Sequence, residues 1–247
     1  MKLRNIFAAT MLLAATLVFA QSDSIIIGAF SAAKPGTALP ENWQPLGVTS
    51  AKNLTRYILV DDAGVTVLRA ESNAAASGVT RRMKIDPVQY PLLKWRWKAS
   101  NIVKAGDVRT REGDDYPARI YVMFDYPLEK LPFSERMKIQ LARTLHDPNL
   151  PAATICYVWD AKAPVGTIVP SSYTDRVRMI VVESGAARVN QWLAFERNVA
   201  ADFRAAFGED APPITAIAVA TDTDNTGESV TAFYGDISFH KQTLSRQ

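Results

Sequence analysis

Short stretches of alternating apolar and polar residues recur along the chain, each bounded by glycine, proline, asparagine or aspartate. Successive side chains of a strand point to opposite faces, so this period of two predicts β-strands. The clearest case is 92–98, where Trp95 and Trp97 fall on one face and three basic residues fall on the other. Predicted strands cover residues 57–60, 65–70, 92–98, 119–124, 155–159, 176–183, 214–221 and 232–239.

The segments between these strands predict how the strands are arranged. Residues 57–60 and 65–70 flank Asp-Asp-Ala-Gly at 61–64, which is typical of a β-hairpin. An apolar segment at 25–27 and the strand at 232–239 stand near the two ends of the chain, and terminal strands that pair are a habit of jelly rolls. The spacing of the strands therefore predicts a mainly β fold, an antiparallel β-sandwich of jelly-roll (galactose-binding-like) type.

Two stretches break the period of two and predict helical insertions. Ser134 can cap a helix that runs to about Thr144, and a second helix is expected over 200–207, ended by Gly208. The apolar face of the first helix would consist of Phe133, Met137, Leu141 and Leu145. Four-residue spacing places these side chains on one face, so we expect that face to pack against the sandwich.

The first twenty residues are typical of a secretory signal. Lys2 and Arg4 precede an uncharged apolar run at 6–19, and Val-Phe-Ala at 18–20 fits a cleavage site. At about 14 residues the run is short for a bilayer span, and an uncleaved anchor is the alternative. We therefore expect a signal peptide at 1–20, a single β-sandwich domain at 21–247, and a periplasmic or secreted protein without a membrane span after cleavage.

Composition and charge narrow the function classes. The chain has 247 residues, 48% hydrophobic and 21% charged, as in a soluble globular protein. Loss of Lys2 and Arg4 would leave 26 of the 28 basic residues against 25 acidic residues, so the formal charge of +3 falls close to neutral. The overall charge thus gives no strong case for binding nucleic acid or an acidic membrane.

Cysteine and histidine are too rare for several kinds of site. The single cysteine excludes an internal disulfide and a multi-cysteine metal site, and two histidines exclude a histidine-rich one. Cys156 falls inside a predicted strand and is expected to be a buried structural residue rather than a nucleophile. The sequence also lacks a phosphate-binding loop, a dinucleotide fingerprint and a serine nucleophile elbow.

The densest polar run, 107–116, directly precedes the predicted strand at 119–124. Its adjacent acids Asp114 and Asp115 repel each other unless solvent, a cation or an arginine such as Arg119 lies close. Their carboxylates could bind a metal ion or sugar hydroxyls. The alternative is an exposed turn that holds a structural Asp–Arg pair.

A second polar run, 221–228, places oxygen-bearing side chains at alternate positions before a glycine, as calcium-binding loops do. The candidate calcium ligands are Asp222, Asp224, Asn225 and Glu228. The match to a helical calcium loop fails, because its twelfth position would be Phe233, which has no carboxylate. The alternative is a polar hairpin tip that uses asparagine and glycine for its turn.

A third candidate site is a basic face shared by three strands. If the strands that carry Arg96, Arg119 and Arg176 are neighbours, one surface would hold Lys94, Arg96, Lys98, Arg119, Tyr121, Arg176 and Arg178. Residues 171–176 lead into this face and add Tyr173 and Asp175. Forked arginine contacts would suit carboxylate, phosphate or sulfate groups, and Tyr121 or Trp159 would stack on sugar rings. The alternative is a solvated sheet face with cross-strand salt bridges.

Four motifs support a family resemblance: Leu-Lys-Trp-Arg-Trp-Lys at 93–98, the run Gly-Asp-Asp-Tyr-Pro-Ala-Arg-Ile-Tyr-Val at 113–122, Tyr-Thr-Asp-Arg-Val-Arg at 173–178, and Thr-Asp-Thr-Asp-Asn-Thr-Gly-Glu at 221–228. Together they resemble the bacterial exported family catalogued as domain of unknown function 3047. The resemblance covers roughly 27–239 and implies that the polar motifs belong to one domain. The family carries no established activity, so the resemblance gives no residue a catalytic role.

These features favour non-catalytic binding of a carbohydrate or a small anionic ligand in the cell envelope, with calcium as a candidate cofactor. The alternative is a carboxylate-dependent glycan hydrolase or lyase that uses acids among Asp114, Asp115, Asp222 and Asp224. In a third interpretation the protein is an assembly partner of the envelope, and the polar motifs only brace loops. Binding and catalysis both require the separated motifs to meet in one hollow.

Overall fold

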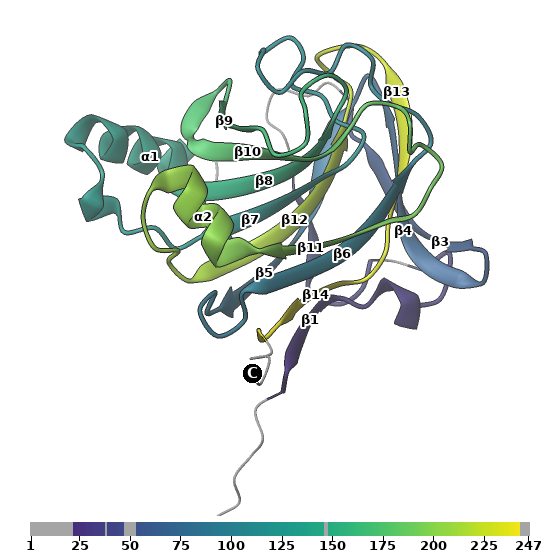
Figure 1. The fold of residues 1–247 in the computed structure, drawn as a ribbon, viewed down its shortest axis with the longest axis horizontal. Coiled ribbons are helices and arrows are strands. Elements are labelled where there is room, and N and C mark those ends of the chain that lie inside the picture. The colour runs from purple at the N-terminus through teal and green to yellow at the C-terminus, as the bar shows by residue number, and fades with distance from the viewer. Residues whose placement is uncertain (1–21, 38, 47–52, 146–147, 243–247) are drawn as a thin grey trace, which may run out of the picture.

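Two β-sheets packed face to face form the body of the protein (Figure 1). The computed structural model describes residues 22–37, 39–46, 53–145 and 148–242, so the predicted signal peptide lies outside the described residues. In this part of the chain each sheet has seven strands. The predicted fold class, a mainly β sandwich of jelly-roll type, is confirmed.

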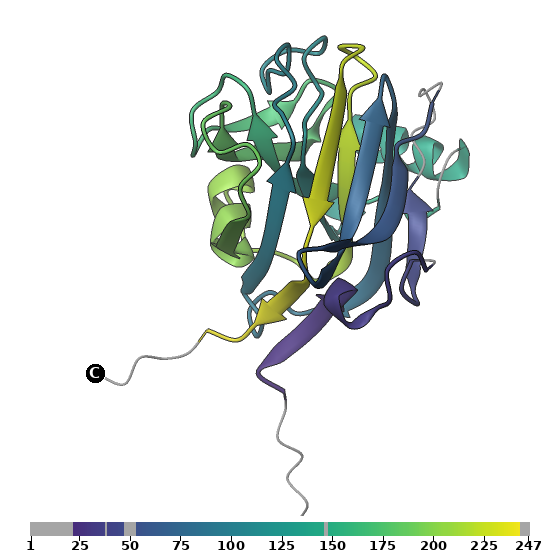
Figure 2. The same ribbon diagram turned by 90° about the vertical axis from the view of Figure 1, so that its right-hand side faces the viewer.

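The first sheet runs in the order β1-β14-β6-β13-β4-β3, and β11 pairs with β6 as well. Its strands are β1 (Ser24–Gly28), β3 (Arg56–Asp62), β4 (Val65–Asn73), β6 (Leu92–Ala99), β11 (Leu193–Asn198), β13 (Ser229–Tyr234) and β14 (Ile237–His240). The strands nearest the two ends of the described chain lie side by side, as predicted, with Ile25 opposite Phe239 (Figure 2). The hairpin predicted at 61–64 joins β3 to β4, and its Ala63 and Gly64 both have positive φ.

The second sheet runs in the order β2-β5-β12-β7-β8-β10-β9. Its strands are β2 (Trp43–Leu46), β5 (Ala76–Ile85), β7 (Arg119–Phe124), β8 (Ala153–Asp160), β9 (Ile168–Ser171), β10 (Thr174–Ser184) and β12 (Ile214–Asp222). Strands β8 and β10 run parallel, and the other paired neighbours of this sheet run antiparallel. Short 3-10 turns lie at Phe30–Ala32 and Leu128–Lys130.

Alternation along the strands decides which side chains fill the space between the sheets. In β6 the side chains of Trp95 and Trp97 are buried, whereas the intervening basic residues are half-exposed. The ring of Trp95 stacks on that of Tyr157 from β8, with ring centroids 5.3 Å apart, so the two sheets meet directly in the core. Burial of such large aromatic surfaces is the main favourable term that holds the sheets together.

The strand predicted at 232–239 is interrupted, because β13 ends at Tyr234 and β14 begins at Ile237. Tyr234 lies opposite Trp97 and Ser238 lies opposite Lys94, so four steps on one strand face three on the other. This is a β-bulge. A Cβ at Gly235 would overlap the Arg96 side chain, so a larger residue there would force Arg96 to move. At this point the outer partner changes from β4 to β1.

Helix α2 (Val199–Phe207) closes one end of the sandwich, as predicted (Figure 1). The Asn198 side chain caps it by accepting a hydrogen bond from the backbone N–H of Ala201, and Gly208 ends it with a φ of 78°. Phe203 is fully buried, and its ring lies 4.6 Å from that of Phe124 in the second sheet.

Helix α1 (Phe133–Leu145) exists as predicted, but two expectations about it are wrong. Ser134 lies inside the first turn rather than at the cap, because the backbone N–H of Arg136 already donates to the carbonyl of Pro132. The predicted apolar face is exposed to solvent, and Ile139 is the buried residue of this helix. Sequence periodicity places side chains on a common face of a helix but does not say which face meets the core.

Two tyrosines of the first sheet connect it to the second sheet by hydrogen bonds at Thr221. The Tyr57 hydroxyl donates to the carbonyl of Ser77 and accepts from the backbone N–H of Thr221. The fully buried Tyr234 hydroxyl lies 2.6 Å from the carbonyl of Ala220 and 2.8 Å from Oγ1 of Thr221. These contacts satisfy polar groups that would otherwise be buried without partners, and they fix the end of β12.

We expect Tyr234→Phe to lower the free energy of unfolding by about 1–3 kcal/mol, because it leaves buried polar partners unsatisfied. Urea denaturation followed by tryptophan fluorescence measures this change. Tyr173→Phe is the matched control, since Tyr173 is exposed and its loss should cost within about 0.5 kcal/mol. Equal stability of wild type and Tyr234→Phe would contradict the bridging role of this hydroxyl.

Candidate functional site

A continuous groove runs over the face of the second sheet that points away from the first sheet. Three adjoining hollows of about 220, 290 and 500 Å³ form it, and Val177 of β10 lines all three. Residues opposite each other in a ladder share a face, and the pairs Thr154–Val177 and Met123–Ala216 lie in the groove. Small residues such as Gly78 and Ala220 help to keep the hollow of about 220 Å³ open.

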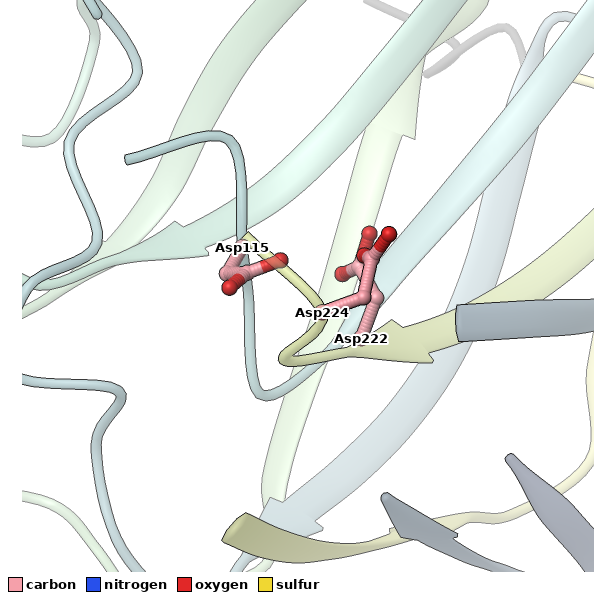
Figure 3. Close-up of side chains that lie close together, drawn as sticks. All are labelled: Asp115, Asp222 and Asp224. Atoms are coloured by element: carbon pink, nitrogen blue, oxygen red, sulfur yellow. The ribbon is translucent and has the colours of Figure 1, made fainter. Parts of the chain in front are cut away.

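The acidic end of the groove forms where the loop before β7 meets the loop after β12. These strands are antiparallel neighbours, with Arg119 opposite Ala220, so their loops emerge at the same edge of the sheet. The two predicted acidic motifs therefore come together, and oxygens of Asp115, Asp222 and Asp224 lie within 4.8 Å of one another (Figure 3). The hollow here is lined by Asp114, Arg119, Tyr121, Tyr173, Asp222, Asp224 and Asn225, together with residues of β5, β9 and β10.

Arg119 is the buried cation of this acidic end, with only 7% of the residue exposed. Its guanidinium forms an ion pair with Asp222, lies 3.8 Å from Asp114 Oδ1, and sits over the ring of Tyr121 with 5.4 Å to the centroid. Within the described residues the Nε of Arg119 has no hydrogen-bond partner. The two carboxylates and the tyrosine ring offset the cost of removing the guanidinium charge from water.

Two of the predicted ligand residues brace loops instead of lining the hollow. The Asp115 carboxylate accepts hydrogen bonds from the backbone N–H groups of Asn225 and Thr226, at 3.3 and 2.6 Å. The Glu228 carboxylate accepts from the N–H groups of Lys104 and Ala105, at 3.0 and 2.8 Å. Both carboxylates thus tie neighbouring loops together, and Glu228 is not part of the acidic cluster.

Burial changes the proton affinity of the acids in the hollow. It raises the pKa of Asp114, although the nearby guanidinium of Arg119 opposes the change. It also raises the pKa of Asp224, and repulsion from Asp115 adds to the effect. Beneath the groove, burial raises the pKa of the Cys156 thiol to about 12, and Cys156 is fully buried in β8 as predicted. The hollow therefore raises the proton affinity of two of its carboxyl groups.

The predicted calcium loop does not form as a ligand set. Asp222 is paired with Arg119 and accepts from the backbone N–H of Tyr116, so a cation already occupies its open side. The Asn225 side chain donates through Nδ2 to the carbonyl of Arg111 and to the Tyr173 hydroxyl. With Glu228 turned to another loop, the four predicted ligands do not converge as calcium requires.

The predicted basic face does not form as one surface, because β6 belongs to the other sheet, although Arg176 lines the same groove as Arg119 and Tyr121. Lys94, Arg96 and Lys98 are on β6 in the first sheet, where Lys98 binds Asp62 at 2.7 Å. Arg119 and Tyr121 line the groove. In β10, Arg176 and Arg178 share the core-side face of Ile180, and both guanidinium groups lie over the Phe207 ring at the sandwich end.

The remaining predicted residues divide between groove and core. Tyr173 lines two of the hollows and is 52% exposed, and the guanidinium of Arg111 lies 4.8 Å from its ring centroid. Asp175 lines the largest of the three hollows in the groove. Trp159 cannot stack on a sugar, because it is fully buried between the sheets and donates its Nε1–H to the carbonyl of Gly185.

Several groove residues carried no signal of their own in the sequence. Pro151, Thr154 and Val177 line the groove beside Tyr121, although they are ordinary strand and loop residues. Their common face follows from the registers of β7, β8 and β10, which depend on long-range pairing. Strand alternation around Tyr121 was the only indication that such a face existed.

The model of the family described as protein of unknown function DUF3047 matches residues 41–238. The chain belongs to this family. A comparison with curated proteins finds no match. The matched residues 41–238 include both acidic loops.

Several solved structures match most of the chain at low sequence identity and with TM-scores below 0.5. One is a mutant of the family 29 carbohydrate-binding module CBM29-2 complexed with cellulohexaose, with 8% identity, a TM-score of 0.35, and coverage of 89% of this chain and 92% of that one. Another is the family 30 carbohydrate-binding module of a Clostridium thermocellum cellulosomal cellulase, with 12% identity, a TM-score of 0.39, and coverage of 81% and 95%. Trichoderma harzianum endoglucanase 3 from family GH12 has 5% identity, a TM-score of 0.41, and coverage of 93% and 100%.

We expect Asp222→Asn to destabilise the protein by about 3–5 kcal/mol, because it leaves the buried Arg119 without its closest counter-charge. Urea denaturation at neutral pH measures this loss. Asp210→Asn is the control, since the Arg204–Asp210 pair is exposed and its loss should cost less than about 1 kcal/mol. If the two substitutions cost the same, Arg119 does not depend on Asp222.

We expect the change in the free energy of unfolding caused by Asp224→Asn to be more favourable at pH 7 than near pH 4. A folded-state pKa above the unfolded value means that the native state binds more protons, so stability from this group is lost as pH rises through the raised pKa. Asp62→Asn is the opposite control, because hydrogen bonds from Lys98 hold the pKa of Asp62 below its ordinary value. Its cost should be full at pH 7 and shrink as pH falls. Denaturation midpoints measured from pH 3 to pH 8 test both variants. If the difference between Asp224→Asn and wild type does not change with pH, the pKa of Asp224 is not raised in the folded protein.

Proposed function

We propose that the protein binds a neutral carbohydrate chain in the groove of the second sheet, without cleaving it. The observation that carries this proposal is that three adjoining hollows, which share Val177, present apolar surface beside oxygen-bearing side chains. Sugars present apolar ring faces and hydroxyl edges, and a groove with both kinds of surface matches them. The three hollows share Val177, so a ligand bound in one of them can extend into the next.

Charge at the acidic end favours a neutral ligand over an anionic one. The hollow is lined by three carboxyl groups, those of Asp114, Asp222 and Asp224, and by a single guanidinium. That guanidinium is already paired with Asp222, so it offers little attraction to a further carboxylate. Hydroxyl groups of a sugar can donate to the carboxyl oxygens of Asp114 and Asp224.

Tyr173 gives the groove an aromatic surface at the junction of two hollows. Its hydroxyl accepts a hydrogen bond from Asn225, which holds the side chain in place, while half of the residue stays exposed. A tyrosine fixed in this way loses little conformational freedom when a sugar ring packs on it. Export across the inner membrane, expected from the N-terminal segment, would place this groove where glycans occur.

Tyr173→Ala should weaken binding of a neutral oligosaccharide about 3- to 10-fold, because it removes the stacking surface. Calorimetric titration with cellohexaose and with xylohexaose tests this, and Phe233→Ala on the other sheet is the control that should leave affinity unchanged. We expect oligogalacturonate to bind more weakly than the neutral oligomers at pH 7. Failure of every neutral oligomer to bind would overturn the proposal. Release of new reducing ends during the titration would favour the alternative, a glycan hydrolase in which Asp114 or Asp224 supplies the proton.

A further inference from the structure

Helix α1 presents its apolar side chains to solvent instead of to the core. Phe133, Met137, Leu141 and Leu145 are 68%, 47%, 59% and 64% exposed, and we call these four residues the α1 stripe. Their four-residue spacing makes them neighbours along one face of the helix. The buried residue of α1, Ile139, lies on the opposite face. The helix is therefore amphipathic, with its apolar side outward.

The α1 stripe differs from the other exposed apolar residues because its members are contiguous. Val88, for example, is 78% exposed but lies in the turn between β5 and β6, away from any helix. Single exposed apolar residues are normal on a protein surface and need no explanation. A row of four large apolar side chains is a feature of surfaces that contact another apolar phase.

Basic side chains flank the α1 stripe. The Arg136 guanidinium lies over the Phe133 ring, 5.6 Å from its centroid, so it borders the stripe directly. Lys138 follows Met137, and its side chain is 75% exposed, although it also contacts Glu135 at 3.2 Å. Between Phe133 and Leu145 there are three basic residues against one acid. Apolar residues bordered by lysine and arginine are typical of helices that lie in the headgroup region of anionic bilayers.

The position and the length of α1 favour a bilayer over a second copy of the chain as the binding partner of the α1 stripe. Helix α1 projects from one side of the molecule in both views (Figures 1 and 2). Thirteen residues make a helix about 20 Å long, and a single stripe of that length offers far less than the roughly 800 Å² per partner of a stable dimer. An interfacial helix needs no such area, because its apolar face is buried among acyl chains.

We propose that the α1 stripe inserts into the interfacial layer of an anionic lipid bilayer, with Arg136 and Lys138 at the headgroups. This inference is independent of the proposed carbohydrate binding. In the part of the chain that the structure describes, no helix is long and apolar enough to cross a membrane, so α1 lies along the surface. Because Glu135, Lys138, Ile139 and Ala142 also line the 500 Å³ hollow of the groove, a docked α1 holds the groove beside the bilayer.

Co-sedimentation with vesicles tests this inference on the purified protein. We expect binding to phosphatidylcholine vesicles that contain about 30% phosphatidylglycerol, weaker binding to pure phosphatidylcholine, and release at about 0.5 M salt. The double substitution Met137→Gln and Leu141→Gln should lower partitioning to the anionic vesicles at least about tenfold, since it removes apolar surface from the middle of the stripe. Lys138→Glu should weaken binding in the same direction.

Val88→Gln is the matched control, because it removes an equally exposed apolar side chain outside the stripe and should leave partitioning unchanged. Thermal melting of each variant should match wild type, since the substituted side chains are exposed. Absence of wild-type binding to anionic vesicles would overturn the inference, as would equal binding by the stripe double variant. A dimer in sedimentation velocity that the double variant abolishes would instead assign the stripe to a second copy and also overturn it. Oligosaccharide titration of the double variant keeps this result separate from the proposed function.

Discussion

The hydrogen bonds at Thr221 are the constraint on which the candidate site depends. Hydroxyl groups of Tyr57 and Tyr234 cross from the first sheet and fix the end of β12, where Asp222 begins the acidic loop. The Tyr234 hydroxyl also accepts from the backbone N–H of Arg119 at 3.3 Å, so the same contact fixes the start of β7. Asp222 and Arg119 therefore hold their positions because the sheets are bound to each other there. Loops held in this way can keep a buried ion pair without a covalent link.

This constraint sets what the groove can recognise. Arg119 compensates the acids around it and so cannot act as a strong anion-binding group, although an arginine beside a groove is usually read as one. Asp115 is engaged with backbone N–H groups, which leaves Asp114 and Asp224 as the acids with raised pKa at the hollow. In the proposed function, recognition would rely on hydrogen bonding to neutral groups and on the ring of Tyr173. The α1 stripe adds a second surface of different chemistry, on the face of α1 that points away from the groove.

Strand alternation around Trp95 and Trp97 was enough to predict the strands and the sandwich, because the period of two is a local property. The sequence could not show that the two acidic loops meet. They meet because β7 and β12 are neighbours, and the strand order depends on long-range pairing. The basic face failed for the same reason: Arg96 and Arg119 lie in different sheets, and no local pattern encodes strand order. Trp159 shows a further limit, because an aromatic residue in a strand has the same pattern whether it faces core or ligand.

The burial of Cys156 beneath the groove has a practical consequence. It is the single thiol of the chain, and it lies opposite both Tyr121 and Met179 in the central strands of the second sheet. A closed native state protects this sulfur from alkylating reagents, so its modification rate reports how often the sheet opens locally. Cys156 is thus a native probe for local opening of the strands beneath the groove, and no engineered label is needed.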